Sequence, residues 1–300
     1  MSLLDEIRPR IRALDAMPSV PAIVQPLAGM LRQDPDNVNL DQVVELVSHD
    51  STVAAQCLRL ANSPLFGRSN TETVRGAVLA LGIKRIEAVV MGCCMNRIVP
   101  AGKWAFDALT FWRHSLACAL VSSRMARLIG YPDPEKAYLA GLLHDLGMLV
   151  NTVICTEEYR HTVEVARQRR IRLHESEREC LGFTHCQSGA ILAQQWKFSP
   201  DVTAVIELHH ETTATTAARP LVALVHLSDL LCRLRDLGYG YYEAMGIDLA
   251  GDDAWSTLVA SYPALAKMDL ARLTMDIDGA MEEITTLVDA VFKPQPLGTP

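Results

Sequence analysis

Apolar residues recur every three or four positions along most of the chain, and strict alternation of apolar and polar residues is nearly absent. Spacing of this kind predicts amphipathic helices, because one face of an α-helix repeats every 3.6 residues. In the segment 52–61, for example, Val53, Cys57 and Leu60 fall on one face. The pattern therefore predicts an all-α protein.

The helical pattern divides into parts with different helix lengths. Residues 1–102 are predicted to form an N-terminal lobe of short helices, bounded by the Pro- and Gly-containing turn 99–102. Residues 103–236 are predicted to form a bundle of longer helices. Residues 237–300 form a C-terminal extension that is expected to be irregular up to 265, helical over 270–292 and frayed at its end.

The expected helices follow from the apolar spacing and from capping and breaking residues at their ends. They are 23–31, 41–48, 52–61, 74–81 and 83–98 in the first lobe, and 107–129, 134–152, 157–170, 175–181, 185–197, 200–210 and 220–235 in the bundle.

Composition limits the classes of partner. Hydrophobic residues make up 49% of the 300 residues, which is enough for a large core. The 28 basic and 35 acidic residues give a net charge of −7, so we expect neither direct nucleic-acid binding nor membrane binding. The one basic run, 167–172, is interpreted as a solvated helix end.

Cysteine usage and the length of the apolar runs favour a soluble, cytoplasmic protein. The eight cysteines lie mostly in apolar stretches and form no Cys-x-x-Cys motif, so we expect reduced core residues. The first residues lack the apolar run of a signal peptide. Charge interrupts each apolar run before the roughly 18 residues of a membrane span.

The candidate chemistry centres on the apolar stretch 137–151, which His144 and Asp145 interrupt. Burying an unpaired carboxylate costs several kcal/mol, so this pair needs partners, and one metal ion serves both. Such a nitrogen and oxygen set suits iron, manganese, nickel or zinc, as one or two ions. The further candidate ligands, on separate predicted helices, are His114, His185, His209, His210 and Asp229.

Two simpler interpretations remain open. Taken singly, a histidine is more often a hydrogen-bonded core or surface residue than a ligand, and His161, His174 and His226 are assigned to that class. The polar set could also form a metal-free hydrogen-bond network that holds the helices in register. Glu211 follows the histidine pair and His226 lies one turn before Asp229, so these two are candidates for supporting the ligands.

Five motifs in the second half resemble, in their order, the signature of the HD superfamily of metal-dependent phosphohydrolases. They are His114-Ser115, Leu142-Leu143-His144-Asp145-Leu146-Gly147, His185-x-x-x-Gly189, His209-His210-Glu211 and His226-Leu227-Ser228-Asp229. The resemblance implies that one metal is held by His114, His144, Asp145 and Asp229. His185, His209 and His210 match the positions at which HD-GYP cyclic-dinucleotide phosphodiesterases hold a second metal.

The first half resembles a narrower group, the HDOD ("HD-related output domain") family of bacterial signalling proteins. The matching segments are PSVP at 18–21, SHDSTVAA at 48–55, LRLANSPLFG at 58–67 and ALGIKR at 80–85. The resemblance covers roughly residues 15–235. It implies a two-lobed all-helical fold, with an HDOD-type N-terminal lobe packed on an HD-like bundle, that serves as a regulatory or output module.

The sequence departs from the HD-GYP enzymes in two places. Met148 stands where they carry a lysine, and the segment 212–216 does not match their Gly-Tyr-Pro loop. A thioether cannot contact a phosphate oxygen electrostatically. We therefore favour a binding and relay module with other signalling proteins as partners, and assign no catalytic residue. The alternative is a metal-dependent phosphohydrolase acting on a nucleotide or cyclic dinucleotide, and either compound is also a candidate ligand of a binding module.

Overall fold

The computed structural model describes residues 3–14, 39–49, 51–62, 71–83, 102–240 and 248–263, with isolated positions between 85 and 99 and between 265 and 285. The regular elements in these residues are helices, which confirms the predicted all-α class. They are α1 (Leu3–Ala13), α3 (Leu40–Ser48), α4 (Ser51–Ala61), α5 (Val74–Leu81), α7 (Ala108–Ile129), α8 (Pro134–Leu143), α9 (Leu146–Ile154), α10 (Thr156–Arg169), α11 (Leu173–Leu181), α12 (His185–Gln195), α13 (Pro200–Leu208), α14 (Arg219–Leu234) and α15 (Asp253–Ser261).

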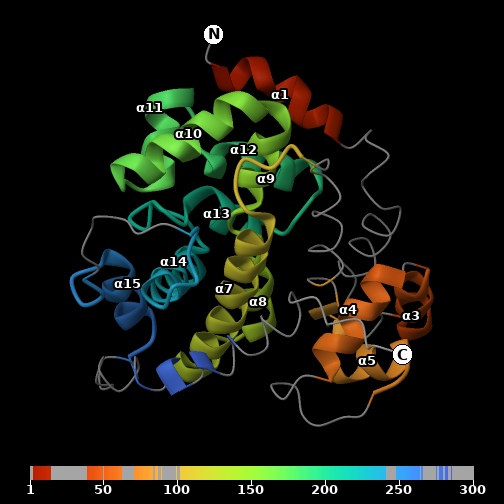
Figure 1. Ribbon diagram of the computed structural model, residues 1–300. Helices are drawn as coiled ribbons and strands as arrows, with labels where there is room; N and C mark the ends of the chain where they lie inside the picture. The colour runs from red at the N-terminus through yellow and green to blue at the C-terminus, as the bar shows by residue number, and fades with distance from the viewer. Residues whose placement is uncertain are drawn as a thin grey trace.

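The described helices form two groups in space (Figure 1). Helices α3, α4 and α5 pack on one another, while α7 runs through the larger bundle and packs along α8 and α14. Helix α1 packs on α9 and α12 of that bundle. The domain boundary near residue 102 stays a prediction. The expected helix 23–31, the segment 18–21 and most of the expected helices 83–98 and 270–292 lie outside the described residues.

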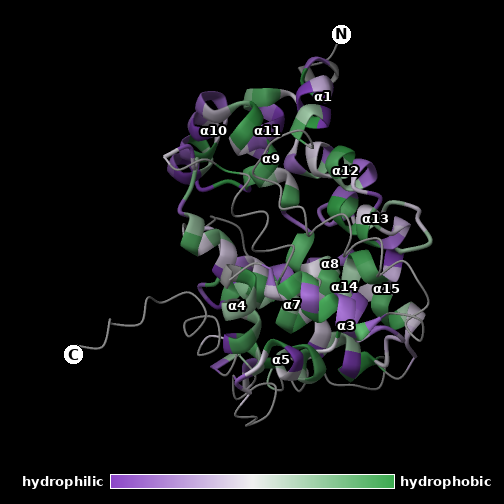
Figure 2. Cartoon of the chain, turned by 90° about the vertical axis from the view of Figure 1, so that its right-hand side faces the viewer, coloured by the Kyte–Doolittle hydropathy of each residue, from purple (hydrophilic) through white to green (hydrophobic). Residues whose placement is uncertain are grey.

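The helices differ in how much of their surface is buried. Helix α9 is buried along almost its full length, whereas α10 buries only Tyr159, Thr162 and Ala166. Figure 2 shows this contrast, with α9 in the green of hydrophobic residues and α10 mostly in the purple of hydrophilic ones. Helix α10 therefore covers the bundle from the solvent side.

The long helix expected over 134–152 is two helices. Helix α8 ends at Leu143 and α9 begins at Leu146, and His144 and Asp145 form the turn between them. The combined segment Pro134–Ile154 is long and apolar enough to cross a membrane, but 89% of its most apolar stretch is buried inside the protein. It is a core segment and does not identify a membrane span, while the cytoplasmic location stays a prediction.

The segment expected to be irregular over 236–265 instead contains α15. The Asp252 side chain accepts a hydrogen bond from the Ala254 amide and caps the helix. Ala254 and Leu258 are buried on the side that packs against α14. Two apolar residues one turn apart are too weak a periodic signal to predict so short a helix.

A close crossing of α9 and α12 positions the start of α12. A Cβ atom on Gly147 would lie 1.7 Å from the His185 carbonyl oxygen, and one on Gly189 would lie 2.8 Å from the Gly147 nitrogen. The two backbones can approach this closely only because neither residue has a side chain. The crossing brings His185 next to the turn that carries His144 and Asp145.

Candidate metal centre

Six of the predicted ligand residues meet inside the bundle, and none of their side chains is more than 1% exposed. They come from different elements: His114 from α7, His144 and Asp145 from the turn after α8, His185 from α12, His209 from the end of α13, and Asp229 from α14.

One oxygen of the Asp145 carboxylate lies close to a first group of ligand atoms. Asp145 Oδ2 lies 3.1 Å from His144 Nε2 and 3.5 Å from His114 Nε2. Asp229 Oδ1 lies 3.3 Å from His114 Nε2. We call these four ligand atoms, from His114, His144, Asp229 and Asp145 Oδ2, the first donor group.

The other oxygen of the same carboxylate meets a second group. Asp145 Oδ1 lies 3.4 Å from His185 Nε2 and 3.5 Å from His209 Nε2. We call these three atoms the second donor group. Asp145 thus stands between two sets of imidazoles, which is the position of a ligand that bridges two ions.

Each of the four imidazoles is held through its Nδ1 atom. The acceptors for His114, His144, His185 and His209 are, in turn, Leu237 O at 2.6 Å, Gly141 O at 2.7 Å, Glu177 Oε2 at 2.7 Å and Val205 O at 3.1 Å. Because these oxygens only accept, Nδ1 carries the hydrogen in each ring. The Nε2 lone pair of each neutral imidazole is then left free for a metal ion.

Arg233 pairs with Asp229 Oδ2 at 3.2 Å, but the rest of the cluster is poorly satisfied without a metal ion. His114 Nε2 lies 3.3 Å from His144 Nε2, and the same distance separates Nε2 of His185 and His209, although neutral rings held in this way have no second hydrogen to share. Among the described residues, Asp145 Oδ1 and Asp229 Oδ1 are buried without a hydrogen-bond partner. Converging nitrogen lone pairs and carboxylate oxygens suit divalent transition metals, so these residues fit one ion in each donor group.

Protons are the other means of balancing these charges. Burial opposes protonation of His114, but Asp145 and Asp229 outweigh it and raise the pKa of His114 to about 10. Burial also opposes protonation of His209, whose pKa is raised to about 10 by Cys186 and Asp145. Metal and protons therefore compete for the same nitrogen atoms.

This competition predicts different pH responses for the metal-free and metal-loaded protein. Stabilisation from a raised histidine pKa is complete below the unfolded value of 6.5 and is lost as the pH rises through about 10. Metal-free protein should lose about 1.4 kcal/mol per pH unit for each such imidazole in this window. Metal-loaded protein should lack this loss, because ions replace the protons. Chemical denaturation across that pH range measures the free energy of unfolding of the metal-free and the metal-loaded protein. Parallel curves of this free energy against pH would contradict the prediction.

Sequence reasoning missed Glu177, which is fully buried on α11. Its carboxylate accepts from the Tyr159 hydroxyl at 2.9 Å and from both the backbone nitrogen and Nδ1 of His185, at 2.9 and 2.7 Å. Glu177 therefore fixes the direction of the His185 ring. The local sequence gives no signal for this role, because the glutamates on either side, Glu175 and Glu179, look the same and are not buried.

We expect Glu177→Gln to weaken metal binding by about 10- to 100-fold, the usual effect of losing a group that orients a ligand. An amide keeps the size of the side chain but loses the negative charge that holds the His185 Nδ1 hydrogen. Competition with a chelator measures the change. Glu179→Gln, two residues away on the exposed side of α11, is the matched control and should leave affinity unchanged. Equal effects of the two substitutions would exclude this role for Glu177.

The remaining predicted site residues lie at the edge of the cluster or away from it. His226 donates from Nδ1 to the His209 carbonyl at 2.7 Å and so holds the end of α13. Glu211 is not brought to the cluster, since its exposed side chain pairs with Arg178 at 2.9 Å. The His210 ring lies 4.1 Å from that of His209, at the edge of the second donor group. The His210 ring also stacks on the ring of His174, with centroids 4.1 Å apart, and no sequence motif places His174 here.

A tyrosine after α14, also missed from the sequence, closes the first donor group. The Tyr239 hydroxyl donates to Asp145 Oδ2 at 2.5 Å, and its ring centroid lies 4.7 Å from that of His114. The Arg233 guanidinium lies 5.6 Å from the centre of the same ring. This short segment thus covers the cluster and, through Leu237 O, also holds His114.

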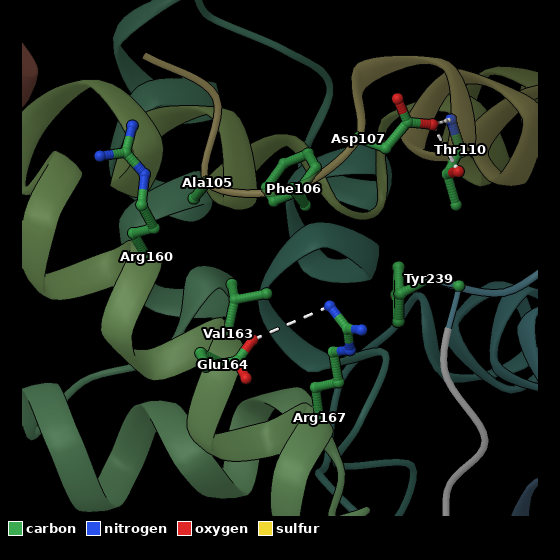
Figure 3. Close-up of a pocket in the computed structure, with 10 residues that line it drawn as sticks. Ala105, Phe106, Asp107, Thr110, Arg160, Val163, Glu164, Arg167 and Tyr239 are labelled. Atoms are coloured by element: carbon green, nitrogen blue, oxygen red, sulfur yellow. Dashed lines mark hydrogen bonds and ion pairs between the residues drawn. The ribbon is translucent and has the colours of Figure 1, made fainter. Parts of the chain in front are cut away.

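Tyr239 also lines a pocket of about 430 Å³ on its outer side (Figure 3). Helix α10 contributes Arg160, Glu164 and Arg167 to this pocket, and the start of α7 contributes Thr110. Phe106 forms part of the wall, next to Asp107, which caps α7. The pocket therefore combines two guanidinium groups, two carboxylates and two aromatic rings, and Arg167 pairs with Glu164 at 3.9 Å.

Comparison with known proteins gives a family match and similar folds. The family model "HDOD domain" matches residues 17–212. An uncharacterized protein of Treponema pallidum (strain Nichols) is 24% identical over 226 residues, which are 74% of this chain and 43% of the relative. The chain thus spans less than half the length of that curated relative.

Two solved structures are similar in fold. An HDOD domain protein of unknown function from Geobacter sulfurreducens matches with a TM-score of 0.78 and 27% identity, over 96% of this chain and 99% of that one. A proposed signal transduction protein from Marinobacter aquaeolei VT8 matches with a TM-score of 0.71 and 21% identity, over 92% of this chain and 60% of that one. At 21% identity, the second likeness shows the shared fold alone.

Proposed function

The chain belongs to the HDOD domain family, and from this premise we propose that it is a signalling output module with a metal-loaded, HD-like centre and little or no hydrolase activity. In this role the ions hold helices together and the surface contacts other signalling proteins. The relative of similar fold that is a proposed signal transduction protein is in line with such a role.

The observation that carries this proposal is that the metal centre is closed to solvent. The imidazole and carboxylate ligands are at most 1% exposed, and the Tyr239 hydroxyl binds the bridging carboxylate directly. A phosphate group could reach Asp145 only after Tyr239 had moved. Met148, where related hydrolases carry a lysine, is buried and offers a phosphate no charge.

The test is turnover by metal-loaded protein. Protein reconstituted with iron, manganese, nickel or zinc is incubated with cyclic dinucleotides, nucleotides and a generic phosphodiester, beside a His144→Ala variant treated in the same way. We expect both proteins to give the same background rate. Turnover of one substrate class by the wild type that His144→Ala abolishes would overturn the proposal in favour of hydrolysis.

A metal-dependent phosphohydrolase is the alternative, favoured by the position of Asp145. Its two oxygens face separate pairs of histidines, as expected for a carboxylate between two cations. Two cations there would polarise a phosphoryl group and activate water. The chain's own contribution would be to hold the four imidazoles through Nδ1 and to keep bulk water out of the cluster.

The pocket outside Tyr239 is the proposed site for a nucleotide or cyclic dinucleotide. Its volume lies in the range of small-molecule sites, and guanidinium groups together with aromatic rings suit phosphates and bases. Because the ring of Tyr239 lines the pocket and its hydroxyl binds Asp145, ligand binding there would act directly on the metal centre. This connection is the proposed relay.

We expect Arg167→Gln to weaken binding of a cyclic dinucleotide about tenfold, since a hydrogen bond to a charged group contributes about 1.5–3 kcal/mol. Trp104 packs against Phe106 with ring centroids 5.6 Å apart, so its fluorescence reports the pocket. Arg124→Gln is the control, because Arg124 lies on α7 about 20 Å along the helix from Thr110. A titration in which both variants match the wild type would exclude this pocket as the ligand site.

A further inference from the structure

We propose that the thiolate of Cys186 is a ligand of the ion in the second donor group, beside His185 and His209. This inference rests on the metal centre proposed above. It adds a sulfur ligand to a site whose ligands predicted from the sequence are all histidine and aspartate.

The second donor group, as defined above, has one ligand atom fewer than the first, and His210, the other candidate beside it, stacks its ring on His174. The first has four nitrogen and oxygen atoms, whereas the second has His185 Nε2, His209 Nε2 and Asp145 Oδ1. Transition-metal sites built from such ligands commonly hold four. Cys186 follows His185 on the first turn of α12, and its Sγ lies 4.0 Å from His209 Nε2.

Cys186 lies close enough to the neighbouring histidines to share a metal ion with them. Its Sγ and one nitrogen each of His185, His209 and His210 all lie within 4.8 Å of one another, and the thiol is only 6% exposed. The same donor group contains Asp145 Oδ1, which is buried without a hydrogen-bond partner among the described residues. A cation between His185 and His209 would lie beside the Cys186 sulfur, and Asp145 Oδ1 lies 3.4 and 3.5 Å from the Nε2 atoms of the same two histidines.

A second buried thiol shows why Cys186 is the better ligand. Cys118 Sγ lies 3.5 Å from His114 Nε2, beside the first donor group. That group already has four ligand atoms without Cys118, although Cys118 Sγ also lies within 4.8 Å of ligand atoms of His114, His144 and Asp229. Cys118 therefore serves as an internal control of similar burial and similar distance from a histidine ligand.

A sulfur ligand would make the two donor groups chemically different. Thiolate favours zinc, iron and cobalt, whereas imidazole with carboxylate also accepts manganese. The second donor group should thus discriminate against manganese more strongly than the first. This difference provides a spectroscopic readout that does not depend on any activity.

Cobalt(II) reconstitution tests the inference, because a thiolate bound to cobalt gives a near-ultraviolet charge-transfer band that nitrogen and oxygen ligands do not give. We expect two cobalt ions per chain and this band in the wild type. Cys186→Ser should lose the band and bind its second ion at least about tenfold more weakly, while Cys118→Ser should keep both properties. A band that survives Cys186→Ser, or two bound cobalt ions without a band, would overturn the inference and leave the metal centre intact.

Folded protein that binds no cobalt would overturn the metal centre and this inference together, so the two failures are distinguished. If Cys186→Ser does not fold, X-ray absorption on zinc-loaded wild type decides the question. A sulfur scatterer at about 2.3 Å from half of the zinc is expected. A shell of nitrogen and oxygen alone would overturn the inference.

Discussion

Asp145→Asn is expected to abolish tight binding of both ions and to lower the free energy of unfolding by about 3–5 kcal/mol, the usual effect of removing one partner from a buried charged set. The carboxylate is fully buried, and its two oxygens face histidines of both donor groups. Asparagine keeps the shape but has one oxygen and no charge. One donor group therefore loses its oxygen ligand and both lose the shared negative charge, and the stabilisation that the ions give to the native state is lost as well.

Elemental analysis of protein purified without chelator measures the metal content, and denaturant unfolding measures the stability. Asp201→Asn is the matched control, since Asp201 carries a partly exposed carboxylate that pairs with Lys136 at 2.7 Å. That substitution should leave metal content unchanged and alter stability by less than about 1 kcal/mol. Wild-type content of two ions in Asp145→Asn would show that this carboxylate does not bridge.

Gly147→Ala is expected to destabilise the protein by about 3 kcal/mol or more and to remove the ion of the second donor group. The new methyl group would lie 1.7 Å from the His185 carbonyl oxygen, and backbone atoms cannot move aside as a flexible side chain can. Helix α12 must shift away from α9. His185 would move with it and leave Glu177, which orients its ring.

Thermal unfolding and metal stoichiometry together measure this effect. Gly279→Ala is the control, because a Cβ at Gly279 meets nothing within 4 Å. It should be neutral or slightly stabilising, since alanine has the higher helix propensity. A Gly147→Ala protein with wild-type stability and two bound ions would contradict the close crossing of α9 and α12.

The two substitutions separate two functions of the same turn. Asp145 provides charge and ligand atoms, whereas Gly147, two residues later, provides space for another helix. Loss of Asp145 should affect both ions, and a shift of α12 should affect mainly the second. A comparison of cobalt stoichiometry in the two variants therefore tests whether the donor groups bind ions separately.

The class of the fold was predictable because helical periodicity is a local property. The spacing of apolar residues gave α7, α12, α13 and α14 with ends close to those observed. It failed at His144 and Asp145, where apolar residues continue through the turn between α8 and α9. It also failed at α15, where only a few residues face α14.

The chain by itself determines that the protein is helical and which nitrogen, oxygen and sulfur atoms are available for metal binding. Only the tertiary structure decides which of them meet. Glu177, Tyr239 and Cys186 reach the cluster, and Glu211 does not, because of how α11, α12 and the segment after α14 pack on the central helices. Contacts between residues distant in the chain depend on helix crossings such as that at Gly147, which local periodicity does not encode.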